Sequence, residues 1–268
     1  MTIISIGQRA CFALAFFVCV AFGASNACAG ELVNVPTRDG VTVDVFWQST
    51  PGATATLLLF PGGGGGFGQV VDGKPTSENF LVRTEAGFAA HGFNIAIFGL
   101  PTDLRDLNYG ARITDAHMRD IAQVVAFIKT RSDVPLWLVG TSRGTVSATA
   151  GAIRLKDAKD GIAGLVLTSS IVSFGKTGAV PKQDIGSLRV PVLVVHNRRD
   201  ACDVCHPNEV HYILDRLTNA SIKKLVWMEG GGPPQGDECG PLHWHGYIGI
   251  ETQTVDVIAN WIAHPAAD

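Results

Sequence analysis

Short apolar runs separated by polar or helix-like segments recur along the chain. Residues 41–47 alternate apolar and polar side chains, a pattern typical of an edge or antiparallel strand. Residues 54–60 are almost continuously apolar, as expected for a strand that is buried on both faces. The same signature predicts further buried strands at residues 93–98, 136–139, 165–168, 192–196 and 224–228.

Between these runs, apolar side chains recur three and four positions apart, which predicts amphipathic helices. The clearest sets are Met118, Ile121, Val125 and Ile128; Val210, Ile213, Leu214 and Leu217; and Ile250, Thr254, Val257, Ile258 and Trp261. Strands that alternate with helices favour an α/β fold, with a mostly parallel sheet and helices on both faces. No repeat or low-complexity linker divides residues 30–268, so we expect one domain there. The longest irregular stretch, residues 173–189, is short for a lid domain.

Residues 1–29 have the pattern of a secretory signal peptide. Arg9 supplies a basic start, residues 10–24 form an apolar segment, and Ala27-Cys28-Ala29 offers the small residues that signal peptidase accepts. The apolar segment is shorter than the roughly 20 residues of a spanning helix. We therefore expect cleavage after Ala29 and export without a stable membrane anchor. The alternatives are an uncleaved anchor, or a lipoprotein on Cys28 despite Ser25 at a position where a lipobox prefers Leu.

Composition narrows the class of protein. The chain has 268 residues, of which 46% are hydrophobic and 17% charged, with 31 glycines and a formal net charge of −3. A disordered chain needs few apolar residues and a large charge imbalance, so that class is excluded. A slightly acidic balance also argues against nucleic acid as a partner, because nucleic-acid binding requires a basic field.

The strongest chemical motif is Gly140-Thr141-Ser142-Arg143-Gly144. It follows the predicted strand at 136–139 and precedes small residues suited to a helix packed closely on a sheet. Gly-x-Ser-x-Gly between a strand and a helix predicts a sharp turn that lifts the serine hydroxyl above the sheet. Flanking glycines are needed there because a Cβ at either position would clash. The alternative is a plain glycine-rich turn; we interpret Ser142 as a nucleophile.

A second glycine-rich segment, Pro61 followed by five glycines, comes directly after the buried strand at 54–60. A phosphate-binding loop would end in Gly-Lys-Ser/Thr and continue into a helix, and this segment does neither. Together with Ser142, it is better explained as half of an oxyanion hole. One N–H group would come from Gly63, or from Gly64 in a shifted register, and the other from Arg143.

A serine nucleophile needs a base, and the base needs an orienting acid. Asp200 follows the predicted strand at 192–196, and we prefer it to Asp203 because it lies closer to that strand. For the base we prefer His245, which precedes the last helix, over His243, which would then line the pocket wall. His196 is interpreted as a buried histidine at a strand end.

The serine turn, the Pro-Gly-Gly-Gly loop, Asp200 and His245 occur in the order that the α/β-hydrolase family shows, and the sequence resembles that family over residues 31–264. The resemblance is to serine esterases and dienelactone hydrolases. It implies a Ser142–His245–Asp200 triad that hydrolyses an ester through an acyl-enzyme. Two departures stand out: Pro61 replaces a common histidine, and Arg143 replaces a neutral residue. Arg143 would either favour an acidic substrate or form a surface ion pair, and we expect the ion pair.

Of the six cysteines, Cys202, Cys205 and Cys239 would remain after signal cleavage. If the triad forms, the loops that carry Asp200 and His245 must meet. A disulfide from Cys202 or Cys205 to Cys239 would then join them, contributing about 2–4 kcal/mol of constraint. The rival is a local Cys202–Cys205 bridge. Thiol–disulfide chemistry or zinc binding at the three cysteines is the weaker interpretation.

The sequence thus predicts an exported serine hydrolase acting on a carboxylic ester of modest size, without metal or organic cofactor. A peptidase, an amidase or an acyltransferase would use the same residues, and a non-catalytic binding protein would have lost one of them. The expected partner is a small-molecule ester, and no residue pattern indicates an oligomeric state.

Overall fold

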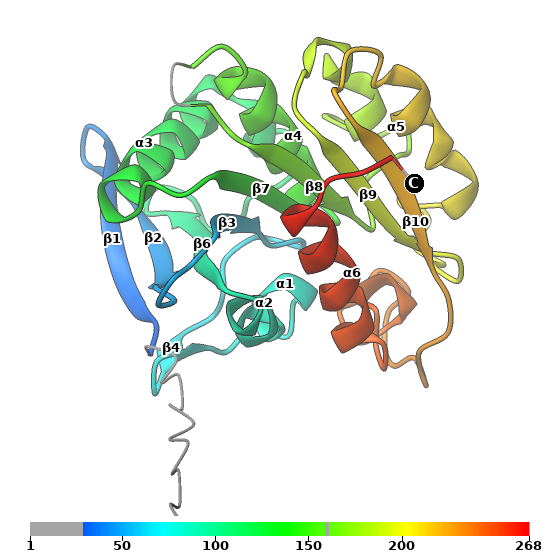
Figure 1. The fold of residues 1–268 in the computed structure, drawn as a ribbon, viewed down its shortest axis with the longest axis horizontal. Helices are drawn as coiled ribbons and strands as arrows, with labels where there is room; N and C mark the ends of the chain where they lie inside the picture. Colours follow the sequence, from blue (N-terminus) through cyan, green and yellow to red (C-terminus); the bar gives the residue numbers. More distant parts are fainter. Residues whose placement is uncertain (1–28, 159–160, 268) are drawn as a thin grey trace, which may run out of the picture.

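Eight strands form one twisted sheet in the computed structural model, which describes residues 29–158 and 161–267 (Figure 1). The predicted signal peptide therefore lies outside the described residues, apart from Ala29. In spatial order the strands are β1 (Glu31–Arg38), β2 (Val41–Gln48), β6 (Phe93–Pro101), β3 (Ala55–Phe60), β7 (Leu136–Thr141), β8 (Gly164–Thr168), β9 (Val192–Asn197) and β10 (Lys223–Met228). The pairs β1–β2 and β2–β6 are antiparallel and all the others are parallel. The short strands β4 (Val70–Val71) and β5 (Lys74–Pro75) form a separate hairpin.

Every residue of β3, β7, β8 and β9 is buried, which is why these segments are apolar without alternation. Successive side chains of β3 enter two different apolar cores: Leu58 and Phe60 pack in one, and Leu57 and Leu59 in the other. The sheet therefore separates two cores, and each needs a layer of helices over it.

Helices cover both faces (Figure 1). The first core is covered by α3 (Asp115–Arg131), α4 (Gly144–Leu155) and α5 (His211–Arg216), and the second by α1 (Phe80–Arg83), α2 (Glu85–Ala90) and α6 (Glu251–Ala263). Single 3-10 turns occur at η1 (Ala111–Ile113), η2 (Val180–Lys182), η3 (Ile185–Ser187), η4 (Pro207–Glu209) and η5 (Trp244–Gly246).

The predicted fold class is confirmed: the sheet is mostly parallel and has helices on both faces. The helix expected over residues 210–217 is shorter: it is α5, His211–Arg216, and the 3-10 turn η4 precedes it. The sequence pattern missed β1, α1 and α2. The segment at 173–189 contains only η2 and η3, so the described part of the chain carries no lid domain there.

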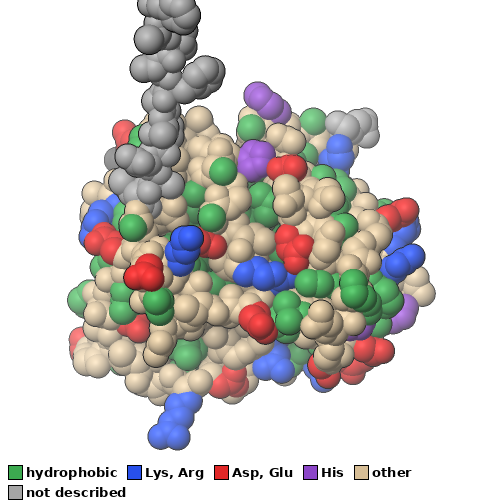
Figure 2. Space-filling model, turned by 90° about the horizontal axis from the view of Figure 1, so that it is seen from below, with side chains coloured by type: hydrophobic (Ala, Val, Ile, Leu, Met, Phe, Trp, Pro, Cys, Tyr) green, Lys and Arg blue, Asp and Glu red, His purple; other side chains and the backbone are tan. Residues whose placement is uncertain are grey.

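The surface carries side chains of both charges. On the face seen in Figure 2, acidic and basic side chains are interspersed rather than gathered by sign. Among the described helices, none combines the length and apolar character that a membrane crossing requires.

Candidate active site

Ser142 stands on the turn between β7 and α4, with a backbone φ of 52°. Positive φ is rare for a residue with a side chain, so the turn is strained and must be held by its surroundings. A Cβ on Gly140 would lie 2.7 Å from the carbonyl oxygen of Gly144, and a Cβ on Gly144 would overlap the carbonyl oxygen of Phe60. Both glycines of the motif are therefore required by close backbone packing, as the sequence predicts.

Hydrogen bonds from the neighbouring strand hold the strained turn. The Ser142 N–H donates to the carbonyl of Thr168 at 3.1 Å, which ties the turn to the end of β8. Thr145 Oγ1 donates to the Ser142 carbonyl at 2.6 Å and accepts the Ile171 N–H at 3.2 Å. The serine backbone thus stays fixed while its side chain lines an open pocket.

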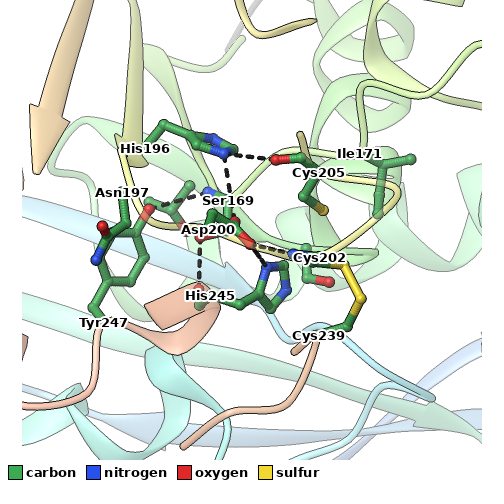
Figure 3. A network of polar contacts seen from close by, with 12 residues as sticks. Ser169, Ile171, His196, Asn197, Asp200, Cys202, Cys205, Cys239, His245 and Tyr247 are labelled. Carbon is green, nitrogen blue, oxygen red and sulfur yellow. Dashed lines mark hydrogen bonds and ion pairs between the residues drawn. A yellow bond between two sulfur atoms is a disulfide. The ribbon is translucent and has the colours of Figure 1, made fainter. Parts of the chain in front are cut away.

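Asp200 is 3% exposed and lies in the loop after β9, against the ring of His245 (Figure 3). The distances from His245 Nδ1 to the two carboxylate oxygens are 2.9 and 3.2 Å. The Cys202 N–H donates to Asp200 at 3.0 Å. Asp203, the alternative acid, is exposed, and its carboxylate lies 3.8 Å from the Cys239 sulfur. The structure therefore brings Asp200 to His245.

His245 is 4% exposed and reaches the site from η5. Because the carboxylate of Asp200 accepts at Nδ1, the proton belongs on Nδ1 and Nε2 carries a lone pair. Within the described residues Nε2 is buried and has no hydrogen-bond partner. The same pocket of about 340 Å³ is lined by both Ser142 and His245. His243, the alternative base, instead packs against Trp244, with 5.1 Å between the centroids of the two rings.

The glycine loop Gly62–Gly66 forms one wall of this pocket. Gly63 has φ 57°, and a Cβ there would meet nothing within 4 Å, so its constraint is conformational rather than steric. Among the described residues, neither the Gly63 nor the Arg143 N–H donates to a protein acceptor. Both amides are therefore available to a ligand. The Gly64 N–H likewise donates to no protein acceptor among the described residues, while the Gly64 carbonyl accepts the Leu107 N–H at 2.8 Å.

The surface ion pair expected for Arg143 is wrong for the described residues. Its guanidinium lies 4.9 Å above the ring of Tyr109, and the ammonium of Lys176 lies 5.8 Å from the same ring. Both cations therefore lie within reach of one aromatic ring, whose quadrupole attracts them.

His196 contacts the acid, which sequence reasoning missed. Its Nε2 donates to the Cys205 carbonyl at 2.8 Å and lies 3.4 Å from Asp200 Oδ2 (Figure 3). Burial lowers the pKa of His196 to about 4, even though Asp200 raises it. The ring is therefore neutral at pH 7 and acts as a hydrogen-bond donor. The available signal was its position four residues before Asp200.

Ser169 and Tyr247 fasten the histidine loop to the sheet, and neither was predicted to do so. The Tyr247 hydroxyl donates to the Val195 carbonyl at 2.8 Å and accepts the Ser169 N–H at 3.1 Å. Ser169 Oγ donates to the His245 carbonyl at 2.7 Å. Burial raises the pKa of Tyr247, so its hydroxyl remains a donor. These bonds set the height of His245 above the sheet.

Cys202 and Cys239 form a disulfide, which joins the acid loop to the histidine loop (Figure 3). The local Cys202–Cys205 bridge is not formed, and Cys205 is a buried thiol. Its sulfur, the Cys202 sulfur and a His245 ring nitrogen lie within 4.8 Å of one another, a ligand set of the kind zinc prefers. That set does not fit a metal here, because Cys202 is in the disulfide and burial raises the pKa of the Cys205 thiol.

Comparison with known proteins identifies the fold. No family model and no curated protein sequence matches the chain. An esterase from Pyrococcus furiosus has a similar structure, with TM-score 0.64 and 14% identity, covering 87% of this chain and 90% of that chain. A dienelactone hydrolase from Anabaena variabilis gives TM-score 0.63 and 13% identity over 88% and 97% of the two chains. An α/β serine hydrolase without a lid from Xanthomonas campestris gives 0.59 and 15% over 89% and 97%.

These similarities, together with the sheet order and the turn at Ser142, place the chain in one structural class. The chain has the fold of the α/β serine hydrolases. In the described residues, the segment between β8 and β9 contains only η2 and η3, so this form of the fold has little or no lid, as the sequence predicts.

Proposed function

We propose that this protein is an exported serine hydrolase that cleaves a carboxylic ester of modest size. The nucleophile is Ser142, the general base is His245, and Asp200 orients the base. The observation that carries the proposal is the hydrogen bonding of the two ring nitrogens of His245. Its Nδ1 lies 2.9 Å from Asp200, while its buried Nε2 has no partner among the described residues and borders the pocket of Ser142. A buried imidazole with one free lone pair is what a general base needs.

In the first half of the reaction, Ser142 Oγ attacks the ester carbonyl carbon and His245 Nε2 accepts the hydroxyl proton. The oxyanion that forms accepts the N–H groups of Gly63 and Arg143. The imidazolium of His245, stabilised by Asp200, then protonates the leaving alcohol oxygen as the C–O bond breaks. The products of this half are the free alcohol and an acyl group on Ser142.

In the second half, His245 Nε2 removes a proton from water, whose oxygen attacks the acyl carbonyl carbon. The same two N–H groups stabilise the second oxyanion. His245 then returns its proton to Ser142 Oγ as the acyl–oxygen bond breaks, which releases the carboxylic acid and restores the enzyme. Every step uses protein groups and water.

The pocket supports a small substrate. A volume of about 340 Å³ lies at the low end of the range for ligand sites, which is about 300–1,000 Å³. Its walls include the glycine backbone, Ser77 and Asn79 as well as Phe80, so polar and apolar groups both line the pocket. A soluble ester suits such a pocket better than a long acyl chain.

Labelling with a fluorophosphonate, located by peptide mass spectrometry, tests the nucleophile. The wild-type protein is expected to carry the adduct on Ser142, and both Ser142→Ala and His245→Ala are expected to lose it. Ser221→Ala and His264→Ala are matched controls, because both residues are exposed and neither side chain makes a polar contact with a described residue. A folded wild type without adduct would contradict the proposal.

An ester and an amide of the same acyl group distinguish the leaving groups. We expect the ester to be hydrolysed and the amide to resist; comparable kcat/KM values would favour the peptidase or amidase alternative. Transfer of the acyl group to an added alcohol in preference to water would instead favour an acyltransferase.

Export is tested separately, by cell fractionation and N-terminal sequencing of the full chain. A mature protein that begins at Gly30 and lies outside the cytoplasm is expected. Intact residues 1–29 on a cytoplasmic protein would overturn the export part of the proposal and leave the chemistry standing.

A further inference from the structure

A buried arginine lies behind the glycine loop. Arg112, in η1, is 1% exposed and is among the largest fully buried side chains of the described residues. Burying a guanidinium costs folding free energy, and the cost is reduced when hydrogen-bond acceptors satisfy its donors. No sequence motif marks Arg112, and no step of the proposed reaction uses its side chain directly.

All its hydrogen bonds go to neutral oxygens. Nε donates to the Leu107 carbonyl at 2.8 Å, and Nη1 donates to Ser147 Oγ at 2.9 Å. Nη2 donates to two carbonyls of the glycine loop, Pro61 at 3.3 Å and Gly63 at 3.1 Å. One planar group therefore connects the loop to α4 through Ser147, and its rigid fork fixes the spacing between them.

The two loop carbonyls that Arg112 holds belong to the peptide groups on either side of the Gly62–Gly63 amide. The carbonyl of Gly62 itself accepts the Gly65 N–H at 3.0 Å. In a planar trans peptide the N–H points opposite to the C=O, so fixing the Gly62 carbonyl fixes the direction of the Gly63 N–H. Arg112 and Gly65 thus orient the amide that the proposed reaction uses as an oxyanion donor.

The charge of Arg112 has no carboxylate partner. No ion pair of this side chain occurs among the described residues, and Asp106 acts on it only through the longer-range field. Burial, and then repulsion from Arg143, lower the pKa of Arg112 to about 9. The group is still charged at pH 7. A positive charge that no acid neutralises therefore lies next to the loop whose N–H group would face the substrate oxyanion.

The second neighbour of Ser147 is kept neutral. His117 Nε2 lies 2.9 Å from Ser147 Oγ, and burial lowers the pKa of His117 to about 3, with a smaller effect from Arg112. Ser147 therefore links Arg112 to α3 without adding a competing charge.

We propose that Arg112 is a positioning residue of the oxyanion hole: it fixes the Gly62–Gly63 amide through the carbonyls of Pro61 and Gly63, and its uncompensated charge favours the oxyanion. The inference rests on the proposed function, since it assigns a purpose to Arg112 in that reaction. It concerns a group that acts mainly in the transition state, so its loss affects kcat more than KM.

The test measures kcat and KM on a soluble ester, with folding checked by circular dichroism. Arg112→Lys keeps a charge but lacks the fork, and Arg112→Ala removes both. We expect kcat to fall about 10–100-fold in each, with KM changed by less than about 3-fold. Arg119→Lys is the matched control, because Arg119 is exposed on α3 and makes no polar side-chain contact with a described residue.

Chemical rescue separates positioning from general damage. Guanidinium at non-denaturing concentration is expected to raise the kcat of Arg112→Ala at least about 5-fold, because it refills a site built for a planar cation. Urea, which has the same shape without charge, is expected to leave kcat unchanged. Failure of guanidinium to act on the folded variant, or an equal rise with urea, overturns the proposal.

Ser147→Ala covers the case in which the arginine variants do not fold. It truncates a single hydroxyl, and we expect it to lower kcat about 3–10-fold by loosening one anchor of the guanidinium. A wild-type kcat in Ser147→Ala, or in folded Arg112→Lys, overturns the inference while Ser142→Ala remains inactive. Hydrolysis that survives in Ser142→Ala overturns the proposed function instead, so the two failures are distinguishable.

Discussion

The histidine loop and the glycine loop border the same pocket but are held in opposite ways. The histidine loop has several tethers: the disulfide, the Tyr247 hydroxyl, Ser169 Oγ and the hydrogen bond between His245 Nδ1 and Asp200. Among the described residues, the glycine loop is held through backbone hydrogen bonds and the side chain of Arg112. Redundant tethers tolerate the loss of one member, whereas a loop held by one side chain does not. The variants below, in order of decreasing effect, test that difference.

Asp200→Asn should have the largest effect. An amide at this position can donate to His245 Nδ1, which would then lose its proton and leave Nε2 without a lone pair for Ser142. By analogy with other serine triads we expect kcat to fall about 10⁴-fold, or about 5 kcal/mol in activation free energy, with little change in stability. Steady-state kinetics check the prediction. Asp203→Asn, on the exposed neighbouring acid, should keep its activity; an equal loss there would mean that the acid has been misassigned.

Removal of the disulfide should affect stability more than activity. We expect Cys202→Ser combined with Cys239→Ser to lower the free energy of unfolding by about 2–4 kcal/mol, because the bridge closes a sequence separation of 37 residues in the unfolded chain. Replacing both residues prevents Cys202 from pairing with Cys205. Urea denaturation with and without reductant measures the effect.

In that double variant kcat should stay within about 3-fold of wild type, since Tyr247 and Ser169 still hold the loop. If kcat instead fell as far as in the Arg112 variants, the contrast between the two loops would not hold.

Tyr247→Phe tests a single tether. It removes the hydroxyl that bridges the Ser169 N–H and the Val195 carbonyl, and these two groups keep only their direct hydrogen bond at 3.2 Å. The loss should cost about 1 kcal/mol of unfolding free energy. We expect kcat to change less than about 3-fold. Tyr212→Phe is the control, because Tyr212 is 38% exposed and its hydroxyl makes no hydrogen bond with a described residue. Equal stabilities of the two variants would contradict the prediction.

The smallest effect concerns pH. The pKa of His196 is lowered to about 4 in the folded protein, so the unfolded chain binds more protons below about pH 6.5. Its contribution to stability is present above that value and is lost as pH falls toward 4. We expect His196→Gln to reduce the dependence of unfolding free energy on pH between 4 and 6 by about 1 kcal/mol per pH unit.

Denaturation curves across this range provide the measurement. His264→Gln, at an exposed position, should leave the slope unchanged. If unfolding free energy depends on pH equally in His196→Gln and in the wild type, other groups cause the loss of stability between pH 6 and 4.

The sequence predicts those parts of the fold whose causes are local. The buried strands show as apolar runs, and the turn at Ser142 shows because Gly140 and Gly144 must lack a Cβ for reasons that the pentapeptide itself expresses. The strand β1 was missed because its exposed and intermediate positions dilute the alternation. Chain order pointed to Asp200 and His245. That these two residues meet, rather than Asp203 and His243, depends on the three-dimensional course of the two loops.

Arg112 was out of reach of the sequence for a different reason. It contacts carbonyl groups that lie 49 and 51 residues away, and carbonyls leave no trace in the identity of Pro61 or Gly63. An arginine in a short turn beside exposed residues is ordinarily solvated. The same holds in part for His196. Its burial is predicted from the sequence, but its contact with Asp200 depends on how the loop after β9 turns back.

The disulfide also changes the connectivity of the chain. It closes a covalent ring of backbone that contains η4, α5 and the edge strand β10. Residues 235–238, within that ring, are exposed. A protease that cut there would leave a nicked molecule whose two fragments stay joined and would separate only on reduction. The same stretch also hydrogen-bonds to the segment that leads to His245: the Gln235 N–H donates to the Leu242 carbonyl at 2.8 Å, and the Asp237 carbonyl accepts the Gly240 N–H at 2.8 Å. A cut there would therefore spare the covalent link between the fragments but loosen the support of that segment.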